Sequence, residues 1–492
     1  MKRNYVFYLL ALFASANIFA QGYTSPNTGD TYTLNDIALA DSSTLVKNGT
    51  SYTLLQDLTI AENDALEVTE SISLAIAEGV RITIDGTLNW NPPTTGATVD
   101  ALTAGTTYDG FWFGQTSNIN ITNSSFINGG GFKVTTANFY MENCTVMYMV
   151  SGASTGAAIS LSRGAPVIEN NLIMYNDLPA IASGANQTVS ATIRGNYIEG
   201  NTKSNQNRPQ LNLSITGTDT LRVINNDIIG DVTLDKVGGI AISNFIGDGA
   251  EIRAIIQGNT IENNRYGITI SGSNVNALIK NNTIENNNTQ GLPNLGGSGI
   301  SLQSNDDTQT VVARNNHIKG NLWGVTLLAK GRIDLGTADD YGHNTFSENG
   351  NNNTSYSLYN NTTNNITAIY NCWEEGVSFD TAADVDQYIV HANDDASLGT
   401  VTFEPFDCAS MSIDTYTTQV NFYPNPSQDV LTIENTQGFD TAAIYNLNGQ
   451  LVASYNLNEG TNTIRFALTT GVYFIKFNST KNKGITKKLL VQ

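Results

Sequence analysis

The chain has little of several residue types on which familiar catalytic sites depend. Its 492 residues include only three cysteines, three histidines and ten prolines. No H-E-x-x-H, C-x-x-C or G-x-S-x-G motif and no phosphate-binding loop is present, so zinc, serine-hydrolase and nucleotide chemistry have no support. Basic residues are also scarce, with 24 Lys and Arg against 44 Asp and Glu and a formal net charge of −20. Without a basic run, the sequence argues against nucleic acid and anionic membranes as partners.

Long apolar runs are missing after the first twenty residues. A positively charged start precedes an apolar stretch, residues 6–16, which is too short to span a bilayer. We therefore predict a signal peptide over residues 1–20, cleaved between Ala20 and Gln21, with a second cleavage motif at residues 14–16. No later segment predicts a transmembrane helix, and we expect a soluble, exported protein.

The few cysteines fit an oxidising compartment outside the cytoplasm. Cys372 and Cys408 lie near the end of one region and could form a disulfide, although the sequence does not establish the pairing. Cys144 then remains alone. We interpret it as a small buried apolar side chain rather than as a reactive thiol.

What the chain has in abundance is a repeated phrase rich in Asn and Ile. An anchoring Asn recurs at intervals of 25, 30, 33, 23 and 34 residues, with Ile two residues later in every copy. The anchors are Asn171, Asn196, Asn226, Asn259, Asn282 and Asn316. The residues five positions after them are Asn176, Asn201, Asp231, Asn264, Asn287 and Asn321.

This repeat predicts an all-β fold, a parallel β-helix of short stacked strands. The intervals vary too much for a solenoid of helical pairs, and the segments are β-branched rather than rich in Ala and Leu at a period of 3.6. One inward Ile per strand would build an aliphatic column, and Asn amides can form hydrogen bonds from turn to turn as a ladder. We expect coils from about residue 50 to about residue 406, with loops inserted at the corners.

The phrase I-x-G-N-x-I-x-x-N, followed by G-I-x-I, resembles the carbohydrate-binding and sugar-hydrolase repeat of pectate-lyase-like, right-handed parallel β-helix proteins. The resemblance covers residues 50–406 and implies the fold. It does not identify the chemistry, because that superfamily holds lyases, hydrolases, adhesins and non-catalytic proteins.

The C-terminal region has a different pattern. Residues 421–492 alternate apolar and polar positions between turn signals, which predicts a small Ig-like β-sandwich. Y-P-N-P at 423–426, Y-N-L-N-G-Q-L-V at 445–452 and G-V-Y-F-I-K at 471–476 resemble the C-terminal sorting domain of the type IX secretion system. The resemblance implies a Bacteroidetes-type source, contact with that secretion machinery, and passage through the outer membrane. It also implies removal of the domain, and release or lipopolysaccharide attachment at the cell surface.

The predicted organisation is therefore a signal peptide (1–20), a β-helix passenger (21–407), a linker (408–420) and a sorting sandwich (421–492). The sandwich holds six basic and four acidic residues, so the negative charge is concentrated in the passenger. An acidic passenger repels polyanions such as pectate or alginate unless a local basic cleft overcomes the repulsion.

Two aromatic residues are the best candidates for binding a glycan. Tyr266 and Trp323 both fall seven residues after an anchor, with Thr289 at the same position between them. Two rings in one column can stack on sugar rings. The alternative is that they pack at a corner beneath a loop, and the sequence leaves both interpretations open.

Two basic residues are the candidates for a lyase. Lys280 and Arg314 stand two residues before their anchors, on what would be adjacent turns facing outward, where cations could neutralise a uronate carboxylate. Glu199, Glu262 and Glu285 stand three residues after theirs. We favour the interpretation of both sets as a solvated face of alternating charge.

Paired acids occur at residues 306–307, 339–340 and 394–395. The segment 334–344 resembles the paired-carboxylate element of polygalacturonase-type hydrolases, but the R-I-K element that follows in that family is absent. We therefore interpret it as an inserted loop. We predict no cofactor; calcium is the cation that such pairs could take, although no EF-hand spacing is present.

These patterns predict an exported cell-surface or secreted β-helix protein that binds a polysaccharide or surface glycan and lacks clear catalytic residues. The alternative is a polysaccharide lyase or glycoside hydrolase that acts on extracellular glycans. A purely structural matrix component is also compatible with the sequence, which leaves open whether the protein is an enzyme.

Overall fold

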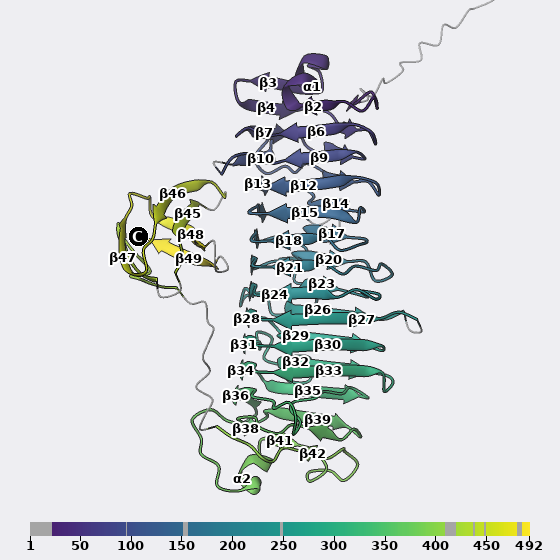
Figure 1. Ribbon diagram of the computed structural model, residues 1–492, viewed down its shortest axis with the longest axis vertical. Coiled ribbons are helices and arrows are strands. Elements are labelled where there is room, and N and C mark those ends of the chain that lie inside the picture. Colours follow the sequence, from purple (N-terminus) through teal and green to yellow (C-terminus); the bar gives the residue numbers. More distant parts are fainter. Residues whose placement is uncertain are drawn as a thin grey trace, which may run out of the picture.

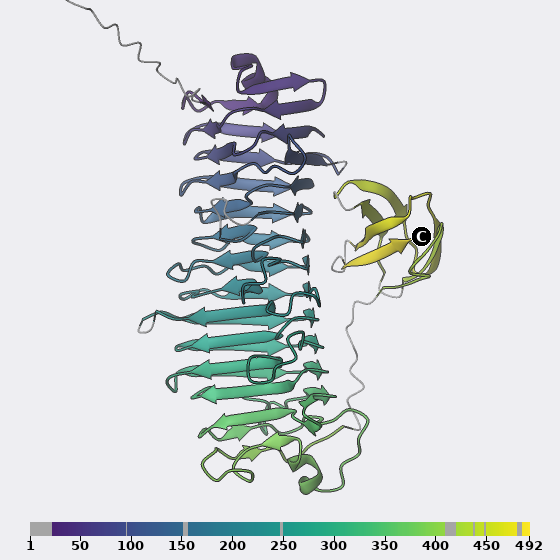
Figure 2. The ribbon, with the colours of Figure 1, turned by 180° about the vertical axis from the view of Figure 1, so that it is seen from behind.

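The computed structural model describes residues 22–94, 96–150, 156–246, 249–408, 420–435, 438–446, 449–479 and 485–492. The expected signal peptide, with its cleavage site between Ala20 and Gln21, lies outside the described residues. Figure 1 shows a tall coil of stacked strands with a smaller β domain beside it, and Figure 2 shows the same arrangement from behind.

Three long sheets run the length of the coil in the described part of the chain, and successive strands of one turn belong to different sheets. Apart from a hairpin of β3 and β4, neighbouring strands within these sheets are parallel. The fourteen-stranded sheet contains β1 (Tyr23–Thr24), β5 (Leu58–Ile60), β8 (Arg81–Ile84), β11 (Gly110–Phe113), β14 (Phe132–Val134), β17 (Ile159–Leu161), β20 (Ile181–Ser183), β23 (Pro209–Leu213), β26 (Gly238–Asn244), β29 (Ile268–Gly272), β32 (Ser298–Ser304), β35 (Trp323–Ala329), β39 (Leu358–Thr362) and β41 (Ile389–Val390). The eleven-stranded sheet contains β2 (Thr31–Thr33), β6 (Ala65–Val68), β9 (Thr87–Trp90), β12 (Asn118–Thr122), β15 (Asn138–Glu142), β18 (Val167–Glu169), β21 (Thr192–Arg194), β24 (Leu221–Ile224), β27 (Ile252–Gln257), β30 (Val275–Lys280) and β33 (Gln309–Arg314). The thirteen-stranded sheet contains β3 (Leu45–Asn48), β4 (Ser51–Leu54), β7 (Ser73–Ile76), β10 (Ala97–Ala101), β13 (Ser124–Ile127), β16 (Thr145–Met147), β19 (Leu172–Met174), β22 (Tyr197–Glu199), β25 (Asp227–Ile229), β28 (Thr260–Glu262), β31 (Thr283–Glu285), β34 (His317–Lys319) and β36 (Thr345–Ser347).

The aliphatic column predicted from the repeat fills the core behind the thirteen-stranded sheet. Each of its isoleucines is 0% exposed and lies in register with the isoleucine of the next turn. Burying such a side chain contributes about 1.5–3 kcal/mol to folding. The column consists of Ile173, Ile198, Ile228, Ile261, Ile284 and Ile318.

One asparagine per turn forms a buried ladder between the eleven- and thirteen-stranded sheets. Each Nδ2 donates to Oδ1 of the next asparagine at 2.9–3.0 Å. Each such bond contributes about 0.5–1.5 kcal/mol. The predicted ladder is thus confirmed, and it continues two turns past the last anchor. Its members are Asn171, Asn196, Asn226, Asn259, Asn282, Asn316, Asn344 and Asn371.

A second amide ladder follows the anchor-plus-five positions, with one exception. Asp231 does not join it, because its carboxylate accepts from the backbone and hydroxyl of Thr233 in a surface turn. Gln210 reaches in from the fourteen-stranded sheet, accepts from Asn201 at 3.1 Å and donates to Asn264 at 3.0 Å. The ladder therefore runs through Asn176, Asn201, Gln210, Asn264, Asn287, Asn321 and Asn349.

The coil begins earlier than the sequence pattern indicated. β1 and β2 already pair with β5 and β6, although their short polar segments lack a repeat signature. Helix α1 (Leu34–Ala40) follows them and buries Leu34 and Ile37. A capping box between Thr33 and Asp36 starts this helix.

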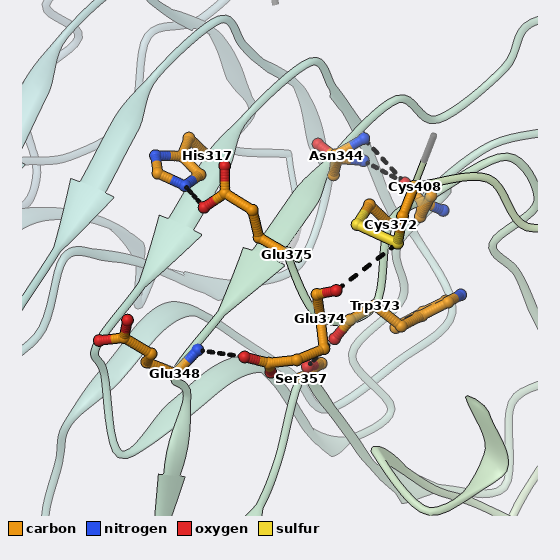
Figure 3. The surroundings of a disulfide bond; sticks show 10 residues. His317, Asn344, Glu348, Ser357, Cys372, Trp373, Glu374, Glu375 and Cys408 are labelled. Carbon is orange, nitrogen blue, oxygen red and sulfur yellow. Dashed lines mark hydrogen bonds and ion pairs between the residues drawn. A yellow bond between two sulfur atoms is a disulfide. The ribbon is translucent and has the colours of Figure 1, made fainter. Parts of the chain in front are cut away.

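The other end of the coil is tied together by a disulfide. Cys372 and Cys408 are joined (Figure 3). Trp373 beside them is fully buried, and its ring is stacked on that of Phe346 with 5.2 Å between the ring centres. Helix α2 (Ala382–Asp386) and the short strands β37 (Gly350–Asn351), β38 (Thr354–Ser355), β40 (Ile366–Thr367) and β42 (Val401–Thr402) lie in this last part of the coil.

The C-terminal domain is an antiparallel two-sheet unit with its own core. One sheet contains β43 (Asn421–Tyr423), β44 (Val430–Asn435) and β47 (Gly460–Arg465); the other contains β45 (Thr441–Asn446), β46 (Leu451–Asn456), β48 (Gly471–Asn478) and β49 (Ile485–Val491). Leu431, Ile433, Ile444, Ile475 and Phe477 are buried between them. The predicted all-β organisation of coil and sandwich is confirmed. Among the residues that the structure describes, no helix is long and apolar enough to cross a membrane.

Candidate functional site

The column that holds Tyr266 and Trp323 crosses the fourteen-stranded sheet at the N-terminal ends of its strands. Because Ile268, Ile300 and Val325 are in register, Tyr266 and Trp323 lie two turns apart in one column. Ser298, rather than Thr289, stands between them. The sequence expectation fails here because an inserted loop carries Thr289 out of the sheet before the chain returns at β32.

Trp323 is the centre of an aromatic cluster, which we call the aromatic platform and define as Trp323, Tyr356 and Tyr359. The Trp323 ring lies 4.6 Å from that of Tyr356 and 4.9 Å from that of Tyr359, and all three side chains are partly exposed. The indole N–H donates to the carbonyl of Pro293 at 3.0 Å, so the inserted loop holds the edge of this ring. The platform therefore presents aromatic surface that is fixed in place but not covered.

The sequence repeat does not predict two members of the platform. Tyr356 and Tyr359 belong to the turn after Trp323, since Val325 pairs with Leu358. The hairpin of β37 and β38 precedes them and shifts their distance from the last anchor. The alignment of the next strand with β35, rather than a count of residues from the last anchor, is the signal that would have predicted Tyr356 and Tyr359.

Tyr266 packs against the preceding turn of the coil. Its ring lies against Gly238, where an added Cβ would stand 2.1 Å from Cζ of Tyr266. Burial raises the pKa of the Tyr266 hydroxyl to about 12. Tyr266 is thus partly exposed and packs against the neighbouring turn, whereas Trp323 belongs to a cluster of three partly exposed rings.

Trp112 presents a different arrangement on the same sheet. Arg81 and Lys133, from the strands on either side of its own, each lie 3.8 Å from its ring centre. These cations occupy the positions from which a sugar would stack, and Arg81 is also paired with Asp109. We interpret this set as a cation–π ladder that stabilises the coil.

Lys280 and Arg314 are neighbours, and Arg314 alternates with the inward Val311 and Ala313, but the chain covers its side chain instead of leaving it exposed. The two residues pair in register on β30 and β33. The Arg314 side chain is buried, with Nε 2.9 Å from Asp340 and a terminal nitrogen 3.0 Å from Asp334. The loop of residues 334–344 supplies both carboxylates and folds over the guanidinium. The charge of Arg314 is therefore already neutralised within the protein.

The acid pairs are also used within loops. Asp307 pairs with Arg332 at 2.9 Å, and hydrogen bonds from Ser273 and Thr308 lower the pKa of Asp306 to about 2. Asp394 accepts from the backbone of His391, and the neighbouring acid from Ser397. Within the described residues, no group of three or more His, Cys, Asp or Glu side chains is arranged to hold a metal ion.

The predicted column of glutamates lies on the outward face of the thirteen-stranded sheet, and it does not alternate in charge. Glu199, Ile229, Glu262, Glu285 and Lys319 follow one another in register. Burial, and then the charge of the neighbouring Glu285, raise the pKa of Glu262.

His317 links the lower part of this column to the disulfide-tied end of the coil. Its Nδ1 lies 3.1 Å from Glu285 and its Nε2 lies 3.2 Å from Glu375, as Figure 3 shows for the second contact. The hydrogen bond with Glu285 raises the pKa of His317 and lowers that of Glu285. Both ring nitrogens are thus engaged in contacts that stabilise the protonated imidazole.

Three parallel sheets, stacked turn on turn with amide ladders at the corners, define a parallel β-helix, and the antiparallel sandwich is a separate domain. In comparisons with known families, residues 134–307 match the right handed beta helix region and residues 421–492 match the secretion system C-terminal sorting domain. A comparison with curated proteins finds none that matches the chain. The protein is therefore a β-helix protein carrying a type IX secretion sorting domain, and it is exported for secretion or attachment at the cell surface. The sorting domain is the part that engages the secretion machinery.

Proposed function

We propose that this exported β-helix protein is a glycan-binding or adhesive protein, and that the aromatic platform is its sugar-stacking surface. The observation that carries the proposal is the gathering of Trp323, Tyr356 and Tyr359 on one face without full burial. Large rings that remain partly in water forgo part of the free energy of burial, which favours a surface kept for a ligand. The apolar faces of sugar rings suit such a surface.

The rigidity of the platform supports this function. The rings come from β35 and from the chain at β39, which are paired in register over five residues. The bond from the indole to Pro293 fixes the orientation of Trp323 before any ligand arrives. Side chains that are already ordered lose less conformational entropy on binding.

A lyase or hydrolase is less well supported. The cation pair on which the lyase hypothesis rests is reduced to Lys280, because Arg314 is bound by Asp334 and Asp340. Lys280 also lies on the eleven-stranded sheet, whereas the platform lies on the fourteen-stranded sheet. The basic group and the sugar-stacking surface therefore do not converge on one cleft.

Affinity electrophoresis of the full chain through gels containing neutral or acidic polysaccharides tests the proposal, with and without calcium. We expect the protein to be retarded in at least one glycan, and Trp323→Ala and Tyr359→Ala to weaken retardation at least tenfold. Tyr341→Ala is the matched control, because Tyr341 is an exposed aromatic residue that stacks on Tyr370 away from the platform. We expect Tyr266→Phe, at a ring outside the platform, to retain binding.

Two results would overturn the proposal. Unchanged retardation in the Trp323→Ala/Tyr359→Ala double variant would show that the platform is not the binding surface. Release of unsaturated sugars or reducing ends from the same glycans would show that the protein is an enzyme.

A further inference from the structure

Two side chains on the outer face of the sorting domain are buried, although their own domain does not cover them. Along β48, Tyr473, Ile475 and Phe477 point into the core of the sandwich. Phe474 and Lys476 alternate with them and so point out of it. Nevertheless Phe474 is 0% exposed and Lys476 is 8% exposed. In an isolated sandwich both side chains would face water, so another part of the chain must cover them.

The β-helix covers them. Figures 1 and 2 both show the small domain beside the coil at the level of its upper and middle turns. Phe474 packs in a buried cluster with outward side chains of three successive strands of the thirteen-stranded sheet, and its ring lies 5.3 Å from that of Tyr197. The coil side of the cluster consists of Met147, Leu172, Met174 and Tyr197.

These apolar side chains are confined to the turns beside the sorting domain. The same two outward columns continue down the sheet, where the register places Asp227, Thr260 and Thr283 in one column. Ile229, Glu262 and Glu285 occupy the other, and Ile229 packs against the margin of the same cluster. Below Ile229 these two columns are polar, so the apolar patch is local and lies at the level of the sandwich.

Polar contacts frame this patch on both sides. Lys476 donates through Nζ to Oδ1 of Asn143 and to the carbonyl of Asn170, and Nζ of Lys488 lies 2.9 Å from Glu199. The sandwich is the basic part of the chain and the coil its acidic part, so the charges of the two surfaces are complementary. Burial lowers the pKa of Lys476 to about 8, consistent with an ammonium group taken out of water.

We propose that Met147, Leu172, Met174 and Tyr197, flanked by Asn143 and Glu199, form a docking face for the protein's own sorting domain. The occupant is the outer face of the four-stranded sheet at β48 and β49. Before processing, the domain is held on the coil instead of trailing from its linker. Removal of the domain uncovers the docking face, so the mature protein presents an apolar surface that the precursor does not. This inference is independent of the glycan proposal, because the docking face and the aromatic platform lie on different sheets.

Acetylation of lysines in the full chain, followed by peptide mass spectrometry, tests the docking. Lys236 is an exposed reference amine. A lowered pKa makes an accessible amine more reactive at neutral pH, so slow modification of Lys476 reports burial alone. We expect Lys476 to react at least tenfold more slowly than Lys236, and Phe474→Asp or Met174→Asp to remove this protection. Both substituted side chains point away from the core of their own domain, so each variant checks the other.

A charge exchange provides the specific test. We expect Glu199→Lys or Lys488→Glu alone to raise the reactivity of Lys476, and the two together to restore protection. Glu67→Lys is the matched control, a charge reversal on the eleven-stranded sheet away from the docking face. If Lys476 reacts as fast as Lys236 in the unsubstituted chain, or if its reactivity is the same in all variants, the docking is refuted.

Discussion

At the scale of single residues, two adjacent positions have different roles at the corner between the eleven- and thirteen-stranded sheets. The residue before each anchoring asparagine has a positive φ, near 55° at Asn170, Asn225, Asn281 and Asn315. This is the left-handed region that Asn and Gly tolerate best. The anchor that follows is free of that requirement and uses its amide for the ladder. An Asn-Asn pair at a corner therefore combines a backbone role with a side-chain role.

Gln210 provides a test of the second ladder. We expect Gln210→Ala to lower the free energy of unfolding by about 1–3 kcal/mol, because the Asn201 amide loses an acceptor and Asn264 loses a donor in a buried site. Urea unfolding monitored by circular dichroism measures the change. Gln187→Ala, at an exposed position, is the control. Equal midpoints for both variants would contradict a structural role for Gln210.

His317 provides a pH-dependent test. Its pKa is raised above the ordinary 6.5, so its contribution is full below pH 6.5 and is lost as the pH rises through the raised value. The pKa of Glu285 is lowered below the ordinary 4.5, so its contribution is lost as the pH falls through the lowered value. We expect the melting temperature difference between the unsubstituted protein and His317→Gln to be greatest between about pH 4.5 and 6.5 and to shrink outside it. A difference that is independent of pH would show that the imidazole acts only through packing.

At the scale of strands, close packing between turns requires glycine at one corner column. A Cβ at Gly267 would lie 2.5 Å from the carbonyl oxygen of Gly299 and 2.6 Å from Cγ2 of Ile284. Both neighbours are fixed by the next turn, so neither can withdraw without separating β29 from β32. The close packing therefore excludes a larger residue at this corner position.

We expect Gly267→Ala to destabilise the coil by about 1–3 kcal/mol through this overpacking. Faster amide hydrogen exchange in β29 and β32, together with a lower melting temperature, would measure it. Gly156→Ala is the control, since the nearest atom to its added Cβ is 3.8 Å away. Unchanged exchange in these strands would show that the turns separate more easily than the contacts indicate.

At the scale of the whole molecule, the disulfide holds the last turns of the coil closed. Cys372 and Cys408 are 36 residues apart in sequence, and a cross-link over such a loop stabilises a protein by about 2–4 kcal/mol. We expect Cys372→Ala/Cys408→Ala to increase hydrogen exchange in β39 and β41 while the upper turns remain protected. Equal exchange along the whole coil would argue against a local role of the bond.

The remaining cysteine should be unreactive. Cys144 should resist alkylation in the folded protein, because burial raises its thiol pKa to about 12.

The whole molecule also separates its two proposed surfaces. The aromatic platform lies on the fourteen-stranded sheet and the docking face on the thirteen-stranded sheet. We therefore expect Phe474→Asp to release the sorting domain without changing the retardation of the full chain in a glycan gel. Altered retardation in this variant would show that the two surfaces are coupled.

The sequence by itself determined the β-helix, its first asparagine ladder and the C-terminal sorting domain. It could do so because each turn contacts the next through equivalent positions, so a repeat of Asn and Ile predicts both strand and partner. The tertiary structure alone decided that Gln210 takes the place of Asp231 in the second ladder. It decided that Ser298, rather than Thr289, lies next to Tyr266 in the column of the next turn. It also decided that Asp334 and Asp340 neutralise Arg314. It also decided which rings join Trp323 and where the sorting domain docks. The physical reason is that inserted loops and distant domains return side chains to positions fixed by packing and charge, which counting along the chain does not predict.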